Sequence, residues 1–148
     1  MTKEEKQLLI KDLCARLPYG VFVEYDYGDG VKRATKFHGN YLYLMMLGKL
    51  QWKDFKPYLR PLSSITDEEL DTLIKSLNNL GLGRVISRDN FTVEPFGVIW
   101  FYNMRFSDCV SNIMMSTVID FLNSIHIDHR ELIEKGLALK APEGMYNS

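Results

Sequence analysis

The stretch that decides the fold is Val21-Phe22-Val23-Glu24-Tyr25-Asp26-Tyr27-Gly28-Asp29-Gly30. Its residues at positions 21, 23, 25 and 27 are apolar or aromatic and alternate with the others, and a period of two is typical of a β-strand. The glycines on either side of Asp29 favour a tight turn, because glycine adopts left-handed backbone angles without a steric cost. The sequence therefore predicts a strand that ends in a turn near Gly30.

Three further strands are predicted after this turn. Val31 to His38 has the pattern of a second strand and Tyr41 to Leu47 that of a third, and Gly39-Asn40 between them suits a two-residue hairpin turn. Gly48-Lys49 predicts another tight turn, which leads into a fourth strand from Leu50 to Phe55. Four short strands with tight connections form an antiparallel meander, and we expect it to bend, with closure into a partial barrel left open.

Two capping boxes mark the starts of helices. In each, a threonine is followed three residues later by a glutamate: Thr2 with Glu5, and Thr66 with Glu69. Leucines at intervals of four give the first helix one apolar face, and the proline at position 18 ends it. A clear apolar stripe follows Thr66, and Gly81 suits the end of that helix. The sequence thus predicts an N-terminal helix and a middle helix around the meander.

The C-terminal half is predicted to combine a second hairpin with further helices. Arg84 to Ser87 and Phe91 to Glu94 have the pattern of two short strands around the turn Arg88-Asp89-Asn90, and Val98 to Tyr102 that of a strongly apolar strand. Ser107 is placed to cap a third helix, and Asp128 to Gly136 predicts a short fourth helix before a tail that has the composition of a loop. We therefore expect a single α+β domain over residues 1–148, with the C-terminal helices packed on the sheet.

The composition is that of an ordinary globular domain. The 148 residues are 46% hydrophobic and 25% charged, and the net charge of -1 lacks the basic excess of a dedicated nucleic-acid binder. Cys14 and Cys109 are too few for a disulfide framework, so we expect free, packed thiols. A charged N-terminal segment, and a longest apolar run (Tyr41 to Leu47) too short to cross a bilayer, predict a cytoplasmic protein.

The densest polar cluster is Ser124-Ile125-His126-Ile127-Asp128-His129. Two histidines and a carboxylate suit a metal ion, but a zinc site needs three or four converging ligands, and the predicted helix cap already uses Asp128. We favour a polar turn between helices and expect neither a metal nor another cofactor. An enzyme would need a pocket in which His126, His129 or Cys109 meets an acid. No arrangement of nucleophile and base is visible in the sequence, so a non-catalytic protein is the better hypothesis.

Two other motifs have a structural interpretation. Gly81-Leu82-Gly83-Arg84 follows a predicted helix instead of preceding one, so it indicates helix termination and not a phosphate-binding loop. Met114-Met115 lies in the third predicted helix. Methionine-rich surfaces are used as adaptable binding grooves, but core packing is the more common role and is the one we expect here.

The segment from Val31 to Arg60 is basic and rich in aromatic residues. It holds seven lysines and arginines against one acid, Asp54. Exposed aromatic rings beside cations suit single-stranded nucleic acid, because bases stack on the rings and phosphates pair with the cations. The candidate nucleic-acid-binding residues are Lys32, Arg33, Lys36, Tyr41, Tyr43, Trp52 and Lys53. The alternative is a sheet with aromatic residues inside and lysines outside, which alternation produces without any ligand, and we favour it.

Three stretches carry a resemblance to a known group of proteins. They are residues 12–20 (Asp-Leu-Cys-Ala-Arg-Leu-Pro-Tyr-Gly), residues 56–64 (Lys-Pro-Tyr-Leu-Arg-Pro-Leu-Ser-Ser), and residues 120–123 with 132–138 and 141–146. Together they resemble a group of small uncharacterised proteins of gut Bacteroidetes and of their phages and mobile elements. The resemblance implies a bacterial or phage setting and no particular activity. An aromatic residue is usual in that group at the position of His129, which argues against a metal role for it.

Our first functional hypothesis is a non-catalytic interaction or adaptor module that contacts another protein, with the segment Pro57 to Pro61 and the C-terminal tail as the places to test. The absence of a catalytic constellation and the ordinary charge balance motivate it. The alternative is a weak nucleic-acid-binding module that uses the basic segment, and it requires the lysines and Arg33 to share one exposed surface. A small enzyme comes third. No membrane partner is expected.

Overall fold

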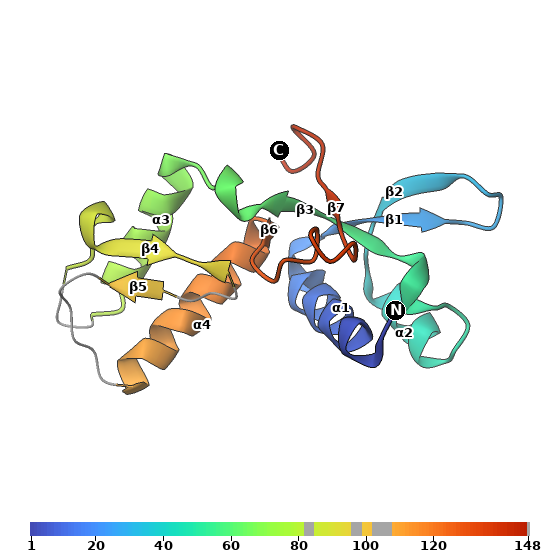
Figure 1. Ribbon diagram of the computed structural model, residues 1–148, viewed down its shortest axis with the longest axis horizontal. Helices are drawn as coiled ribbons and strands as arrows, with labels where there is room; N and C mark the ends of the chain where they lie inside the picture. The colour runs from blue at the N-terminus through green and yellow to red at the C-terminus, as the bar shows by residue number, and fades with distance from the viewer. Residues whose placement is uncertain (82–84, 96–98, 102–107, 148) are drawn as a thin grey trace.

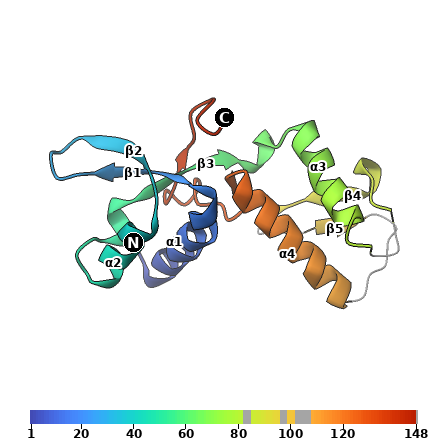
Figure 2. The ribbon, with the colours of Figure 1, turned by 180° about the vertical axis from the view of Figure 1, so that it is seen from behind.

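The computed structural model describes residues 1–81, 85–95, 99–101 and 108–147, and within them the chain has the predicted α+β class. Figure 1 shows two groups of elements side by side along the long axis. The sheet lobe holds α1 (Lys3–Arg16), α2 (Gly39–Met46), β1 (Phe22–Asp26), β2 (Lys32–Lys36) and β3 (Lys56–Pro61). The helical lobe holds α3 (Asp67–Asn78), α4 (Asp108–Ser124), β4 (Phe91–Val93) and β5 (Ile99–Phe101). The view from behind in Figure 2 shows the same division.

Both predicted capping boxes form. The Thr2 hydroxyl accepts from the Glu5 backbone N–H at 3.1 Å, and the Glu5 carboxylate accepts from the Thr2 N–H at 2.6 Å. The Thr66 and Glu69 pair does the same at the start of α3, at 3.2 and 2.9 Å. These bonds satisfy backbone donors that a helix leaves unpaired in its first turn, which is why the boxes fix where α1 and α3 begin.

The main sheet is mixed. β2 and β3 lie on either side of β1 and are antiparallel to it, with Phe22 opposite Lys36 and Val23 opposite Pro57. Two short strands from the C-terminal part of the chain, β6 (Ile127–Asp128) and β7 (Leu139–Lys140), pair parallel with β3. β3 is therefore the shared strand, and it passes from the sheet lobe to the helical lobe (Figure 1).

The third and fourth strands of the predicted meander are wrong. Residues 39–46 form helix α2, and the segment from Leu50 to Phe55 contains a 3-10 turn at Trp52–Asp54. A short apolar run fits a buried strand and a helix equally well, so its period does not decide between them. In the fold, Tyr41, Leu42 and Met45 face the core at helical spacing. The observed meander is β2-β1-β3, and it stays open.

The helical lobe contains a hairpin, but not the predicted one, which joins residues 84–87 and 91–94 around the turn from Arg88 to Asn90. β4 and β5 pair antiparallel, with Phe91 opposite Phe101 and Val93 opposite Ile99. Residues 85–87 form no strand, whereas the structure of Arg84 lies outside the described residues, as does that of Ser107, the predicted cap of α4. Gly81 ends α3 with a φ of +67°, as predicted.

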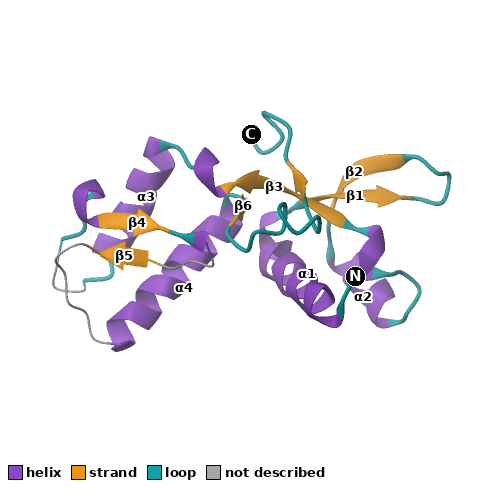
Figure 3. Ribbon diagram, in the orientation of Figure 1, coloured by secondary structure: helices purple, strands orange, loops and turns teal. Residues whose placement is uncertain are grey.

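The predicted fourth helix is absent from the described residues 128–136, which Figure 3 shows as loop after β6. Asp128 still accepts from two backbone N–H groups, those of Leu132 at 2.9 Å and Ile133 at 2.8 Å, as a helix cap would. However, Glu131 has a φ of +58°, a left-handed conformation that interrupts an α-helix. The chain therefore makes turns here and returns to β3 as β7.

Each lobe has its own cluster of buried apolar side chains. The first lies between α1, the sheet, α2 and residues 132–138, and it is built around Leu9, Leu13, Leu59 and Leu132. The second lies between α3, α4 and the β4-β5 hairpin, and Leu77, Met114 and Leu122 are fully buried in it. Met114 thus has the predicted core role, while Met115 is 37% exposed.

Candidate functional site

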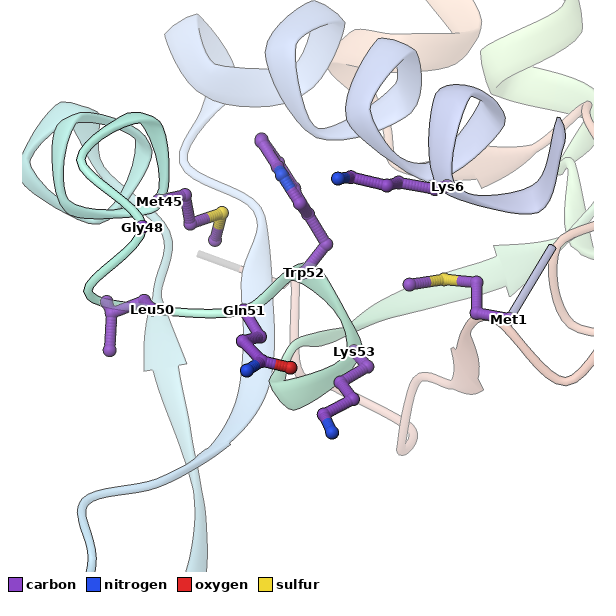
Figure 4. A pocket seen from close by; sticks show the side chains of 8 residues that line it. All are labelled: Met1, Lys6, Met45, Gly48, Leu50, Gln51, Trp52 and Lys53. Atoms are coloured by element: carbon purple, nitrogen blue, oxygen red, sulfur yellow. The ribbon is translucent and has the colours of Figure 1, made fainter. Parts of the chain in front are cut away.

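A hollow beside α2 brings together an aromatic ring, thioethers and cations. It has a volume of about 420 Å³, and Figure 4 shows the side chains around it. We call it the Trp52 hollow, and its lining residues are Met1, Lys6, Met45, Gly48, Leu50, Gln51, Trp52 and Lys53. They come from the N-terminal segment and α1 and from residues 45–53, so the hollow forms where α1 meets the loop after α2.

Short-range backbone bonds hold Trp52 in place. The Asp54 N–H donates to the Gln51 carbonyl at 3.1 Å, the Phe55 N–H donates to the Trp52 carbonyl at 3.2 Å, and the Asp54 carboxylate accepts from the Gln51 N–H at 3.3 Å. Phe55 is 1% exposed and anchors the turn in the core. Trp52 is half-buried and packs against the first apolar cluster, so one part of the indole is fixed while the rest lines the hollow.

α2 leaves an apolar face uncovered just before the chain runs into the residues that line this hollow. Tyr43 is 61% exposed, Met46 76% and Leu47 50%. We call these three residues the α2 patch. The opposite face of α2, with Met45, is buried in the core, so packing within the lobe fixes the helix and presents the patch to solvent. Clustered exposed apolar side chains of this kind mark interaction sites more often than single ones do.

The charge of the Trp52 hollow is positive. Its lining contains Lys6 from α1 and Lys53 from the turn, and none of the described lining residues is acidic. In Figure 4 the Lys6 side chain extends toward the indole of Trp52, while Lys53 points away from it. Lys49, in the loop between the patch and the hollow, is also exposed. The site thus pairs an apolar surface with a rim of flexible cations.

The predicted nucleic-acid-binding cations do not share one face. Lys32, Arg33 and Lys36 all lie on β2, and because successive side chains of a strand point to opposite faces, Arg33 is opposite the two lysines. Arg33 binds the Asp29 carboxylate at 2.6 Å, and Lys32 binds that of Glu24 at 3.1 Å. The Lys36 ammonium lies 5.7 Å from the centre of the Phe22 ring.

Lys32 and Lys53 both line a second hollow, of about 380 Å³, over β1 and the 3-10 turn. Lys56 also lines it, but so do three acids, Glu24, Asp26 and Asp54. The cations and acids balance in number, so this hollow offers phosphate groups little net attraction. The nucleic-acid-binding role of these residues stays a prediction.

The predicted aromatic residues divide into two kinds. Tyr41 belongs to an internal aromatic cluster, with its ring 6.0 Å from that of Phe37 and 5.5 Å from that of Phe55, and burial raises its pKa. Tyr43 and Trp52 are the ones that reach the surface or a hollow. The aromatic residues of the basic segment therefore divide into two groups: some pack in the core, and Tyr43 and Trp52 belong to the α2 patch and the Trp52 hollow. They do not form one stacking platform.

A buried ionic network joins the two lobes, and sequence reasoning missed it. Asp12 of α1 accepts from Arg16 Nε at 2.8 Å, from Arg16 Nη2 at 2.9 Å and from Arg130 Nη1 at 2.7 Å. Arg16 Nη2 also donates to the Ile127 carbonyl at 2.8 Å. Asp12 and Arg16 are fully buried. Their spacing of four residues signals a helical ion pair, but nothing in that spacing shows that the pair is internal.

The two histidines of the polar cluster are buried next to this network. Asn123 Oδ1 lies 3.0 Å from His129 Nε2, and no group of three or more metal-ligating side chains occurs among the described residues. Burial, reinforced by nearby arginines, lowers the pKa of His126 to about 4 and that of His129 to about 3, so both are neutral at pH 7. Both Asp128 oxygens already accept backbone N–H groups. The cluster makes a turn after α4, as predicted, but it is buried and leads into β6 instead of into a second helix.

Cys14, the cysteine whose side chain is described, does not have the environment of a reactive thiol. Cys14 is a free thiol on the exposed face of α1, and partial burial raises its pKa, which disfavours the nucleophilic thiolate. The packed position expected for Cys14 is therefore wrong. The side chain of Cys109 lies outside the described residues.

Comparison with known proteins finds no match for this chain among family models, curated proteins or solved structures. The resemblance to small proteins of Bacteroidetes and their phages therefore stays a prediction. Among the described residues, no helix combines the length and apolar character needed to span a membrane.

Proposed function

We propose that this chain is a non-catalytic protein-interaction module that docks an acidic segment of a partner protein on the α2 patch and the Trp52 hollow. The observation that carries the proposal is a set of three exposed apolar side chains, Tyr43, Met46 and Leu47, at the end of α2. From there the chain runs directly into a concave site that contains lysines and no acid among its described lining residues.

The apolar part of the site suits large side chains of a partner. Met45 and Met1 line the hollow and Met46 belongs to the patch, and unbranched thioether side chains adapt their shape to different partners. Trp52 adds a rigid, half-buried ring of the kind that is enriched at binding hot spots. An aromatic or leucine side chain of the partner would enter the hollow and remove this surface from water.

The cations select the partner by charge. Lys6 and Lys53 line the hollow and Lys49 lies between the hollow and the patch, so carboxylates that flank the apolar anchor would meet them. At an exposed rim such pairs contribute more to the association rate and to specificity than to affinity. An acidic partner is favoured over a basic one for this reason.

Two features favour a protein partner over nucleic acid. The lysines of β2 are separated from Arg33 by the strand, and the hollow where Lys32 and Lys53 meet contains as many acids as cations. A bound strand needs a continuous row of cations to follow its phosphates, whereas a peptide needs only a local patch.

The proposed docking site differs from the two segments, Pro57 to Pro61 and the C-terminal tail, that the sequence suggests as the places to test. Pro57 to Pro61 is most of the central strand β3, and Pro57 and Leu59 are buried. Variants in this segment would therefore damage the fold and would not report on a partner. The C-terminal tail is held through Tyr146, whose hydroxyl donates to the Tyr58 carbonyl at 2.6 Å.

Fluorescence anisotropy of two labelled peptides tests the proposal. The peptides share the same leucine and phenylalanine positions, and one carries glutamates where the other carries lysines. We expect the acidic peptide to bind more tightly, and Met46→Lys or the pair Lys6→Glu and Lys53→Glu to weaken it at least about tenfold, the equivalent of 1.4 kcal/mol. Val85→Lys is the matched control, because Val85 is 79% exposed but lies in the helical lobe.

Three results would contradict the proposal. Equal binding of the two peptides would remove the charge argument, and equal loss in Met46→Lys and Val85→Lys would remove the patch. Tighter, strongly salt-dependent binding of labelled single-stranded DNA or RNA, lost on mutating Lys32 and Lys36, would favour the nucleic-acid hypothesis instead.

A further inference from the structure

Tyr146 fills a slot between two strands of the sheet. β1 and β3 pair through Val23 opposite Pro57 and Glu24 opposite Lys56. One step further along the two strands, at Phe22 and Tyr58, the paired register has ended. Instead the Tyr146 hydroxyl accepts from the Phe22 N–H at 3.1 Å and donates to the Tyr58 carbonyl at 2.6 Å. The phenol thus stands where the sheet ladder stops, and it satisfies one donor and one acceptor of the backbone.

The ring of Tyr146 stacks on one ring and makes a tilted contact with another. It lies 3.8 Å from the centre of the His126 imidazole with 21° between the planes, and 5.8 Å from the Phe22 ring at 53°. His126 is 5% exposed and has a φ of +60°, so the backbone holds it in a conformation that few residues other than glycine adopt. Its Nδ1 has no hydrogen-bond partner among the described residues.

This slot opens on a hollow of about 530 Å³ where the two lobes meet. Phe22, Lys36, His126 and Tyr146 line it, together with Arg60, which is bound to Glu69 at 2.6 Å. Burial raises the pKa of Tyr146 to about 12, so its hydroxyl remains protonated at neutral pH and can donate. The slot therefore recognises a neutral phenol by its flat ring, its proton and its oxygen.

The segment that carries Tyr146 is a short turn after β7. In the part of the chain that the structure describes, residues 142–147 make their backbone hydrogen bonds to each other, from Met145 to Pro142 and from Asn147 to Gly144. Among the described residues, the hydrogen bonds that tie this segment to the rest of the molecule are those of the Tyr146 hydroxyl. Figure 1 shows the backbone of the segment continuing from β7 to the C-terminus near the junction of the lobes.

We propose that the slot between Phe22, Tyr58 and His126 is a phenol-binding site, which Tyr146 occupies within the chain and which accepts a 4-alkylphenol from another molecule when Tyr146 is absent. The ligand is either a free phenol or the side chain of a tyrosine in a peptide, since both present the same ring and hydroxyl. This site is separate from the α2 patch and does not depend on the function proposed for it.

Chemical rescue of Tyr146→Ala tests this proposal. We expect Tyr146→Ala to unfold at a lower temperature than the wild-type protein, and p-cresol to raise that temperature in a saturable way. At ten times the dissociation constant, linkage predicts a rise of about 3 to 6 °C. Wild-type protein should gain little, because its slot is full, and toluene should be a poor substitute because it lacks the hydroxyl. Tyr43→Ala, which removes an exposed tyrosine, is the control that p-cresol should not rescue.

A peptide of sequence Ala-Pro-Glu-Gly-Met-Tyr-Asn (residues 141–147) distinguishes the two sources of the phenol. Rescue by this peptide at lower concentrations than p-cresol indicates a site for tyrosyl side chains, and rescue by p-cresol alone indicates a site for small phenols. Equal stabilisation of wild-type protein and Tyr146→Ala by p-cresol would overturn the proposal, as would no effect on Tyr146→Ala. If Tyr146→Ala is unfolded while Tyr146→Phe folds, p-cresol should restore the near-ultraviolet circular dichroism of Tyr146→Ala. Failure of p-cresol to do so would also overturn the proposal.

Discussion

Substitution of Asp12 by asparagine changes the side chain little, yet the structure predicts that it lowers the free energy of unfolding strongly. The Asp12 carboxylate is fully buried and accepts three hydrogen bonds of 2.7 to 2.9 Å from two guanidinium groups. In Asp12→Asn the amide keeps the shape but loses the charge, so Arg16 and Arg130 remain buried without their shared counter-ion. Removing one partner of a buried ion pair costs about 3–5 kcal/mol. That is a large part of the ~5–15 kcal/mol by which typical domains are stable.

Urea unfolding followed by circular dichroism measures this loss. With a loss of about 4 kcal/mol and a urea dependence of about 2 kcal/mol per molar, the unfolding midpoint should fall by about 2 M. Asp71→Asn is the matched control. It breaks a pair with Arg88 that is at least as short, at 2.6 Å, but lies on the surface, where solvent screens it, so it should barely move the midpoint. If Asp12→Asn and Asp71→Asn shift the midpoint equally, the reasoning about the buried network is refuted.

Three further predictions concern stability. Thr66→Ala removes the side-chain cap of α3 and should cost about 1 kcal/mol in the free energy of unfolding, measured in urea, whereas Thr66→Ser should be close to neutral; equal losses in both would contradict the capping role. The hydrogen bonds from Arg60 hold the pKa of Glu69 below its ordinary value, so this carboxylate contributes stability above its unfolded pKa. The difference between wild-type protein and Glu69→Gln should therefore shrink as the pH falls through the folded pKa, and a difference that persists at pH 2 would argue against it. Burial holds His126 and His129 neutral, with pKa values of about 4 and 3, below the unfolded value near 6.5. Their contribution is thus complete above pH 6.5 and declines as the pH falls toward 4, and an NMR titration that gives either imidazole a pKa above 6 would contradict their burial.

Local signals in the sequence were sufficient for much of the fold. The threonine and glutamate pairs at the starts of α1 and α3 predict those helices correctly, because a capping box is a bond between neighbours in the chain. The alternation after Val21 predicts β1 for the same reason. The run from Tyr41 to Leu47 is different, since both a strand and a helix can bury part of it, and the choice depends on contacts with the core.

The candidate site depends on contacts that the sequence does not record. Trp52 and Lys53 were singled out within the basic segment, but Lys6 reaches the same hollow from α1, far away in the chain. Arg33 was grouped with Lys32 although alternation along β2 places them on opposite faces. For the buried network, the link between Asp12 and Arg130 spans most of the chain, and no local pattern predicts it.

The most direct test of the docking surface is selection from a displayed library of random peptides on immobilised wild-type protein, with Met46→Lys and Val85→Lys processed in parallel. The proposed function predicts enrichment, on wild-type protein and Val85→Lys, of peptides in which acidic residues flank a leucine or an aromatic residue, and loss of that enrichment on Met46→Lys. Enrichment of the same peptides on all three proteins, or of basic peptides, would contradict it.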